Sequence, residues 1–83
     1  MFYVYVLRCS DGTFYTGYSI DVNERVNKHN KGTASKYTRS RRPVKLAAKW
    51  QYDTKSAALK AEASFKRLTR AEKMRKVSSS NLS

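Results

Sequence analysis

The sequence predicts a small α/β domain of the α+β type, in which a three-stranded sheet packs against three or more helices. Two apolar runs near the N-terminus flank Ser10-Asp11-Gly12, which is the pattern of a β-hairpin. Farther along, Asp21 and Thr69 each precede a segment with helical spacing of apolar residues, as N-cap residues do. With 83 residues, the chain has room for one core and one site.

The expected hairpin strands are residues 2–8 and 13–18, a region that holds four of the six tyrosines. A two-residue loop between them would point Tyr5 and Tyr15 to opposite faces of the sheet. A three-residue loop, with Gly12 left-handed at a bulge, would place both on one face. We favour the three-residue loop because it explains the tyrosines, although the sequence alone leaves both loops open.

After the hairpin, the pattern predicts a helix over residues 22–30. Asp21 is its expected N-cap, Glu24 completes a capping-box-like pattern, and Gly32 lies just beyond its end. A basic loop, residues 31–43, follows this helix.

The third strand is expected over residues 44–52, and a longer helix over 55–68. A second capping box then opens a last helix that ends near Val77. Residues 78–83 are expected to form a flexible tail. The sequence thus predicts a single domain over residues 1–77.

The charge of the chain favours a polyanionic partner. Eighteen Lys and Arg stand against six Asp and Glu, which gives a formal net charge of +12. Nucleic acid is the leading candidate. Cys9, the only cysteine, excludes an internal disulfide, and we see neither a signal peptide nor an apolar run long enough for a bilayer. We therefore expect a cytoplasmic or nucleoid-associated protein that does not bind membranes.

One acidic residue lacks a structural explanation. Five of the six acids belong to turns or helix starts: Asp11, Asp21, Glu24, Asp53 and Glu72. Glu62 instead falls between Ala58 and Phe65, within the predicted apolar arc of its helix, which also includes Leu59. A carboxylate on a buried face needs a cation. An ion pair with Lys or Arg and a divalent-metal ligand are equally open interpretations.

The first helix carries a second unexplained pair. Arg25 and His29 are four residues apart and lie together beside the apolar stripe of Val22 and Val26. Taken alone, such residues are usually solvated. The alternative is that Arg25 and His29 form one functional site together with the tyrosines of the hairpin.

Together these residues resemble the GIY-YIG nuclease superfamily. The two name motifs match Tyr3-Val4-Tyr5 and Tyr15-Thr16-Gly17, and the family's later Arg, His or Tyr, and Glu match Arg25, His29 and Glu62. The segment "KYTRSRRPVKL" is similar to small stand-alone bacterial and viral members, relatives of the nuclease domain of the excision-repair subunit UvrC.

The resemblance implies a metal-dependent endonuclease that cleaves DNA or RNA with little sequence specificity, with DNA repair or processing as its expected process. Glu62 would hold one Mg or Mn ion, and Arg25 would bind the non-bridging phosphate oxygens. Tyr5 would be the general base and Tyr15 would position phosphate or water. His29 would hydrogen-bond nearby or assist proton transfer, and Gly17 would serve the motif's structure.

Three positions depart from the family pattern. Tyr3 replaces the first glycine of the name motif, Tyr18 stands where several nucleases have a basic or small residue, and Met74 stands where some active members have Asn. A noncatalytic nucleic-acid-binding module therefore stays open as the alternative. We expect Tyr5, Tyr15 and Arg25 to converge with Glu62 on one concave patch.

The basic loop is the expected binding element. Its residues would follow a nucleic-acid backbone, with the tyrosine stacked on a base: Lys36, Tyr37, Arg39, Arg41 and Arg42. A solvated loop is an equally open interpretation. The expected partner is DNA or RNA, and a larger repair complex is compatible with this expectation.

Overall fold

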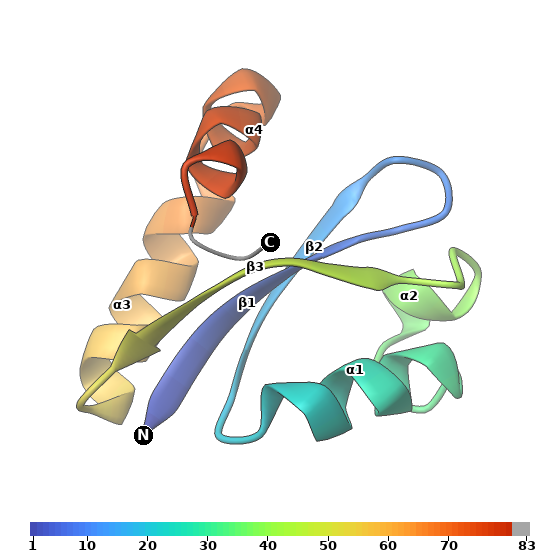
Figure 1. Cartoon of the computed structure of the whole chain (residues 1–83), viewed down its shortest axis with the longest axis horizontal. Helices are drawn as coiled ribbons and strands as arrows, with labels where there is room; N and C mark the ends of the chain where they lie inside the picture. The colour runs from blue at the N-terminus through green and yellow to red at the C-terminus, as the bar shows by residue number, and fades with distance from the viewer. Residues whose placement is uncertain (81–83) are drawn as a thin grey trace.

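The computed structural model describes residues 1–80 and contains three strands and four helices (Figure 1). In chain order these are β1 (Phe2–Arg8), β2 (Phe14–Ser19), α1 (Val22–Asn30), α2 (Lys36–Arg39), β3 (Lys45–Tyr52), α3 (Lys55–Lys66) and α4 (Arg70–Ser78). The strands form one antiparallel sheet in the order β2-β1-β3, so β2 is an edge strand. The predicted α+β class with a three-stranded sheet is confirmed.

The hairpin has the three-residue loop. The Cys9 N–H donates to the Thr13 carbonyl at 2.8 Å, and the Gly12 N–H donates to the Cys9 carbonyl at 3.0 Å. Gly12 has φ of 83°, a left-handed conformation that favours glycine. In the resulting register, Tyr5 and Tyr15 share one face of the sheet.

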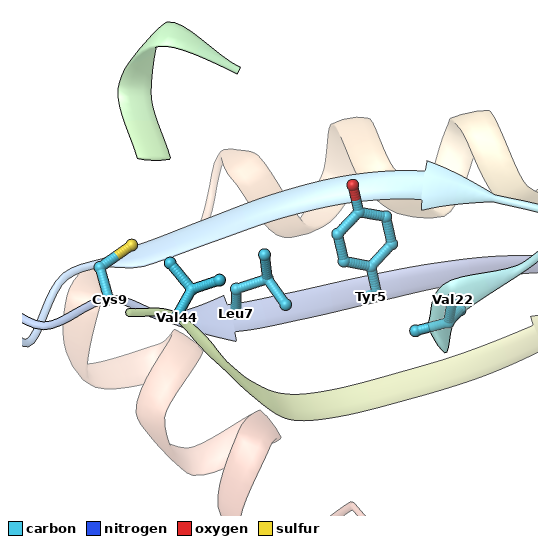
Figure 2. Close-up of a cluster of buried hydrophobic side chains, with 5 residues drawn as sticks. All are labelled: Tyr5, Leu7, Cys9, Val22 and Val44. Atoms are coloured by element: carbon cyan, nitrogen blue, oxygen red, sulfur yellow. The ribbon is translucent and has the colours of Figure 1, made fainter. Parts of the chain in front are cut away.

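Two hydrophobic clusters cover the two faces of the sheet. One contains Tyr5, Leu7, Cys9, Val22 and Val44 (Figure 2). The other contains Val6, Ala48 and Phe65, with Leu68 and Val77 against it. Alternate residues of a strand point to opposite faces, so Tyr5 and Val6 lie in different clusters. Helix α1 covers the face of Tyr5, whereas α3 and α4 cover the face of Val6.

The helix starts agree with the sequence pattern. The Asp21 side chain accepts a hydrogen bond from the Glu24 N–H at 3.1 Å and caps α1. Thr54 caps α3, and Thr69 and Glu72 complete the predicted capping box of α4. None of the described helices has the length and apolar character needed to cross a membrane.

The helix ends and the basic loop differ in detail from the predictions. Helix α3 ends two residues early, at Lys66, and α4 extends to Ser78, the first residue of the expected tail. The end of that tail, residues 81–83, lies outside the described residues. The expected loop over 31–43 contains the short helix α2, because the Ser35 hydroxyl accepts from the Tyr37 N–H and starts a helical turn.

Candidate active site

Tyr5 lies at the centre of the site, on the middle strand β1. Its side chain is 1% exposed, and its hydroxyl lies over Gly17 of the neighbouring strand. A Cβ at position 17 would stand 2.5 Å from that hydroxyl oxygen. Position 17 therefore needs glycine for close approach, which gives a physical reason for the glycine of the second name motif.

His29 of α1 connects Tyr5 to α2. Its Nε2 lies 3.0 Å from the Tyr5 hydroxyl, and its Nδ1 lies 2.8 Å from Oγ1 of Thr38. His29 is 1% exposed, so the interpretation of it as a solvated residue is wrong. Burial and the charge of Arg25 lower the pKa of His29, which keeps the imidazole neutral near pH 7.

Thr38 is the residue that sequence reasoning missed. It contacts His29 across nine residues of chain, through the fold of the α1–α2 segment. No local motif marks such a contact. Recognition of Ser35 as an N-cap would have placed Thr38 on a helical turn, but not against the imidazole.

Tyr15 lies in a row of aromatic rings on the same face. Its ring centroid is 5.0 Å from that of His29 in an edge arrangement and 5.9 Å from that of Tyr37. The Arg41 guanidinium covers the Tyr37 ring at 3.9 Å. Tyr15, Tyr37 and Arg41 thus connect the basic loop, residues 31–43, to the Tyr5–His29 pair.

The charges around Tyr5 show which side chains reach it. Burial raises the pKa of Tyr5 to about 12, and Tyr15 and the Glu62 carboxylate add to the increase. The charge of the Arg25 guanidinium opposes this increase in the pKa of Tyr5. The structure therefore brings Tyr5, Tyr15 and Arg25 together and places Glu62 within electrostatic reach of Tyr5.

Glu62 belongs to α3, the helix on the other side of the sheet, and its expected convergence with the tyrosines and Arg25 on one concave patch stays a prediction. Its helix α3 packs through Phe65 against the face opposite the tyrosine rings and also lies along the edge strand β2. The side chain is 18% exposed and forms an ion pair with Lys66 at 3.2 Å, one helical turn away. Leu59, predicted on the buried face of α3, is instead 42% exposed.

A metal ion at this site would have few protein ligands. Within residues 1–80, no three His, Cys, Asp or Glu side chains gather into a metal-binding group. A single partly buried carboxylate fits Mg²⁺ or Mn²⁺, because such hard cations often keep several waters and complete their shell with substrate phosphate. Glu62 is the carboxylate that fits this arrangement.

The arginines of the basic loop, residues 31–43, form two groups that differ in their contacts. Arg41 is engaged within the protein: its Nε donates to Asp11 at 3.0 Å and its NH1 to the Tyr37 carbonyl at 2.8 Å. Arg39 and Arg42 donate through Nε to carbonyl oxygens and face a hollow of about 400 Å³. Asn30, Ser40 and Pro43 complete the lining of this hollow. Lys36 is exposed at the start of α2.

Comparisons with known proteins find one family model and several similar proteins. Residues 1–76 match the family model described as the GIY-YIG catalytic domain. UPF0213 proteins of Staphylococcus aureus strains Mu3 and N315 are each 55% identical over 73 residues, covering 88% of this chain and 89% of theirs.

Two solved structures are also similar. The solution NMR structure of the UPF0213 protein BH0048 from Bacillus halodurans is 46% identical, with a TM-score of 0.62. The match covers 94% of this chain and 84% of that protein. The solution NMR structure of EF2693 from E. faecalis is 46% identical, with a TM-score of 0.59, over 88% of this chain and 79% of that one.

The family match indicates a general class of activity. GIY-YIG proteins are nucleases, which act on nucleic acids and generally use a divalent metal. The match spans nearly all of the described residues, and the relatives are small proteins of similar length. The chain therefore belongs to the GIY-YIG family, within its small stand-alone UPF0213 group.

Proposed function

We propose that this protein is a divalent-metal-dependent endonuclease that hydrolyses phosphodiester bonds of DNA or RNA. The observation that carries the proposal is the buried Tyr5–His29 pair beside Arg25. A phenol held 3.0 Å from a neutral imidazole and next to a guanidinium combines a proton acceptor with a phosphate-binding cation. Packing alone does not require this combination.

Arg25 is the proposed phosphate-binding residue. Its planar guanidinium suits two non-bridging oxygens, and its position beside Tyr5 would bring the scissile phosphate to the phenol. Tyr15, packed in an edge arrangement against His29, would limit where the phosphate and the attacking water sit. A divalent cation held by Glu62 would neutralise phosphoryl charge and activate bound water.

Proton transfer needs two residues because Tyr5 alone is a poor base. With a pKa of about 12, its phenol is fully protonated at neutral pH. When the attacking water gives a proton to the Tyr5 oxygen, the phenol can pass its own proton to Nε2 of His29. The water O–H bond breaks and a new phosphorus–oxygen bond forms, while the bond between phosphorus and the leaving sugar oxygen breaks. The leaving oxygen takes a proton from solvent, and the imidazolium later returns its own proton to solvent. His29 thus serves as the final acceptor.

All proposed hydrogen bonds and ion pairs to the substrate are to phosphate, so we expect little sequence preference. Arg39 and Arg42 would bind backbone phosphates at the hollow that they line. Tyr37, which is 38% exposed, would offer one ring edge to a base. A role in DNA repair or processing would suit such a nuclease.

The second candidate is a noncatalytic nucleic-acid-binding module. The ion pair of Glu62 with Lys66 favours it, since the carboxylate already has a cation. Cleavage assays on single-stranded, duplex and branched DNA and RNA, with Mg²⁺ or Mn²⁺ and with chelator, separate the two. We expect metal-dependent cleavage by the wild type that Tyr5→Phe abolishes. Binding of every substrate without cleavage of any would establish the module.

A further inference from the structure

We propose that Thr38 is a positioning residue that holds His29 in the one tautomer able to take the proton of Tyr5. Thr38 is fully buried, and its Oγ1 lies 2.8 Å from Nδ1 of His29. Its consequence for cleavage rests on the proposed function. The tautomer itself does not, and it can be measured on the free protein.

The assignment follows from counting donors. Three protons need acceptors: those of the Tyr5 phenol, the Thr38 hydroxyl and the neutral imidazole. The Thr38 hydroxyl lies 3.3 Å from the Ser35 carbonyl, to which it can donate. Its oxygen then accepts from Nδ1–H, which leaves the lone pair of Nε2 free to accept from the phenol. All three donors are satisfied.

The opposite tautomer leaves one donor without a partner. If Nε2 carried the proton, it would donate to Tyr5, and the Thr38 hydroxyl would donate to Nδ1. The phenol proton would then have no acceptor among residues 1–80, because Nε2 of His29 is the only side-chain atom there within hydrogen-bond distance that could accept it, and Arg25 is a donor. A buried donor that is left without an acceptor destabilises the folded protein. The first tautomer is therefore the stable one.

This tautomer also determines the direction of proton transfer. An imidazole with a free Nε2 can receive a proton from Tyr5, whereas one with Nε2–H cannot. After transfer, Nδ1–H of the imidazolium still donates to Thr38. Thr38 would therefore act on the reaction only through His29, without touching the substrate.

The tautomer can be read directly by NMR because His29 is the only histidine in the chain. We expect long-range ¹H–¹⁵N spectra of ¹⁵N-histidine-labelled wild type, in chelator near pH 7.5, to show Nδ1 protonated and Nε2 unprotonated. Thr38→Val, which has nearly the same shape without the hydroxyl, should shift the pattern toward Nε2–H. Thr38→Ser should keep the wild-type pattern. A wild type with Nε2–H would overturn the proposal, whether or not the protein cleaves nucleic acid.

Cleavage provides the second measurement. At saturating substrate, Thr38→Val should slow single-turnover cleavage by about tenfold or more, as loss of an orienting partner does for histidines in metal sites. Its Kd in chelator should stay at the wild-type value, and Thr38→Ser should recover most of the rate. Thr33→Val is the matched control, because its hydroxyl donates to the Lys28 carbonyl and does not touch His29. If Thr38→Val shows the wild-type tautomer and rate, Thr38 has no positioning role.

Discussion

The phenol oxygen of Tyr5 lies 3.0 Å from Nε2 of His29, and both side chains are 1% exposed. The two residues come from the middle strand of the sheet and from the last turn of α1, 24 positions apart. A neutral pair is the form that burial favours, since burial raises the pKa of the phenol and lowers that of the imidazole. The pair is therefore part of the core as well as of the site.

This burial predicts acid lability. The pKa of His29 is lowered in the folded protein, whereas the unfolded chain keeps a value near 6.5. Below pH 6.5 the His29 side chain binds a proton in the unfolded state but not in the folded state. Part of the free energy of unfolding present at pH 7.5 should therefore be lost as pH falls toward about 5. Urea denaturation at several pH values measures the loss.

The carboxyl groups of Asp11 and Glu72 have a lowered pKa, because hydrogen bonds from Thr13 and Thr69 favour their charged form, so they titrate farther below this pH range. His29→Gln is the control, since glutamine does not titrate there. Its free energy of unfolding should change much less than that of the wild type between pH 7.5 and 5. If the free energy of unfolding changed equally with pH in the wild type and in His29→Gln, the assignment of His29 as a buried neutral base would be wrong.

Gly17→Ala should disturb Tyr5 more than the fold. The added Cβ would stand 2.5 Å from the phenol oxygen, which is held by His29 and cannot easily move. We expect a loss of about 1–3 kcal/mol in stability from overpacking and a large loss of cleavage rate. Unfolding and single-turnover cleavage are measured on the same preparation.

Gly12→Ala is the matched control for this substitution. Its Cβ would enter open space, but φ of 83° imposes strain of about 1–2 kcal/mol on any other residue. The two variants should lose similar stability, while only Gly17→Ala loses activity. Equal cleavage by both would show that the approach of Tyr5 to position 17 has no catalytic importance.

The two groups of basic residues should differ in their salt dependence. Replacing Arg39 and Arg42 together by Ala should weaken nucleic-acid binding and reduce the slope of log K against log salt by about 0.7–0.9 for each phosphate that is no longer neutralised. Arg41→Ala should change the slope less, because its guanidinium is engaged with Asp11 and Tyr37. Binding titrations at several salt concentrations test this difference. A larger change of slope for Arg41→Ala would mean that Arg41, and not the hollow, binds the backbone.

The sequence was sufficient for the elements whose signals are local. The turn at Gly12 and the caps Asp21 and Thr69 predicted the hairpin and two helix starts, because turn and cap residues act on backbone groups a few positions away. Ser35 carries the same signal for α2, but the surrounding positive charge led to an expectation of an irregular loop.

The parts of the site that escaped prediction depend on long-range packing. Periodicity placed His29 beside the apolar stripe of α1, but only the position of β1 and α2 shows that it is buried between Tyr5 and Thr38. Arg41 likewise resembles any other surface cation until Asp11, 30 residues earlier, is seen to pair with it. Residue type identified these candidates, whereas the fold determines which of them touch.

The last prediction separates the two interpretations of Glu62. Glu62→Gln keeps the shape of the side chain and removes the charge that would hold a cation, so we expect loss of cleavage. Binding in chelator should stay near wild type or increase slightly, because a negative charge near phosphate is gone. Its ion pair with Lys66 is of the i,i+4 type, which stabilises helices by only about 0.2–0.5 kcal/mol, so the variant should fold.

Lys66→Ala is the control, because it breaks the same ion pair and keeps the carboxylate. If Glu62 is a metal ligand, Lys66→Ala should cleave at least as fast as wild type, since the metal no longer competes with the ammonium group. The Mn²⁺ concentration that gives half of the maximal cleavage rate should then be lower in this variant than in the wild type. If instead Glu62 serves only as the partner of Lys66, the two substitutions should have equal and small effects on cleavage and stability. That result would remove Glu62 from the metal site while leaving the Tyr5–His29 pair in place.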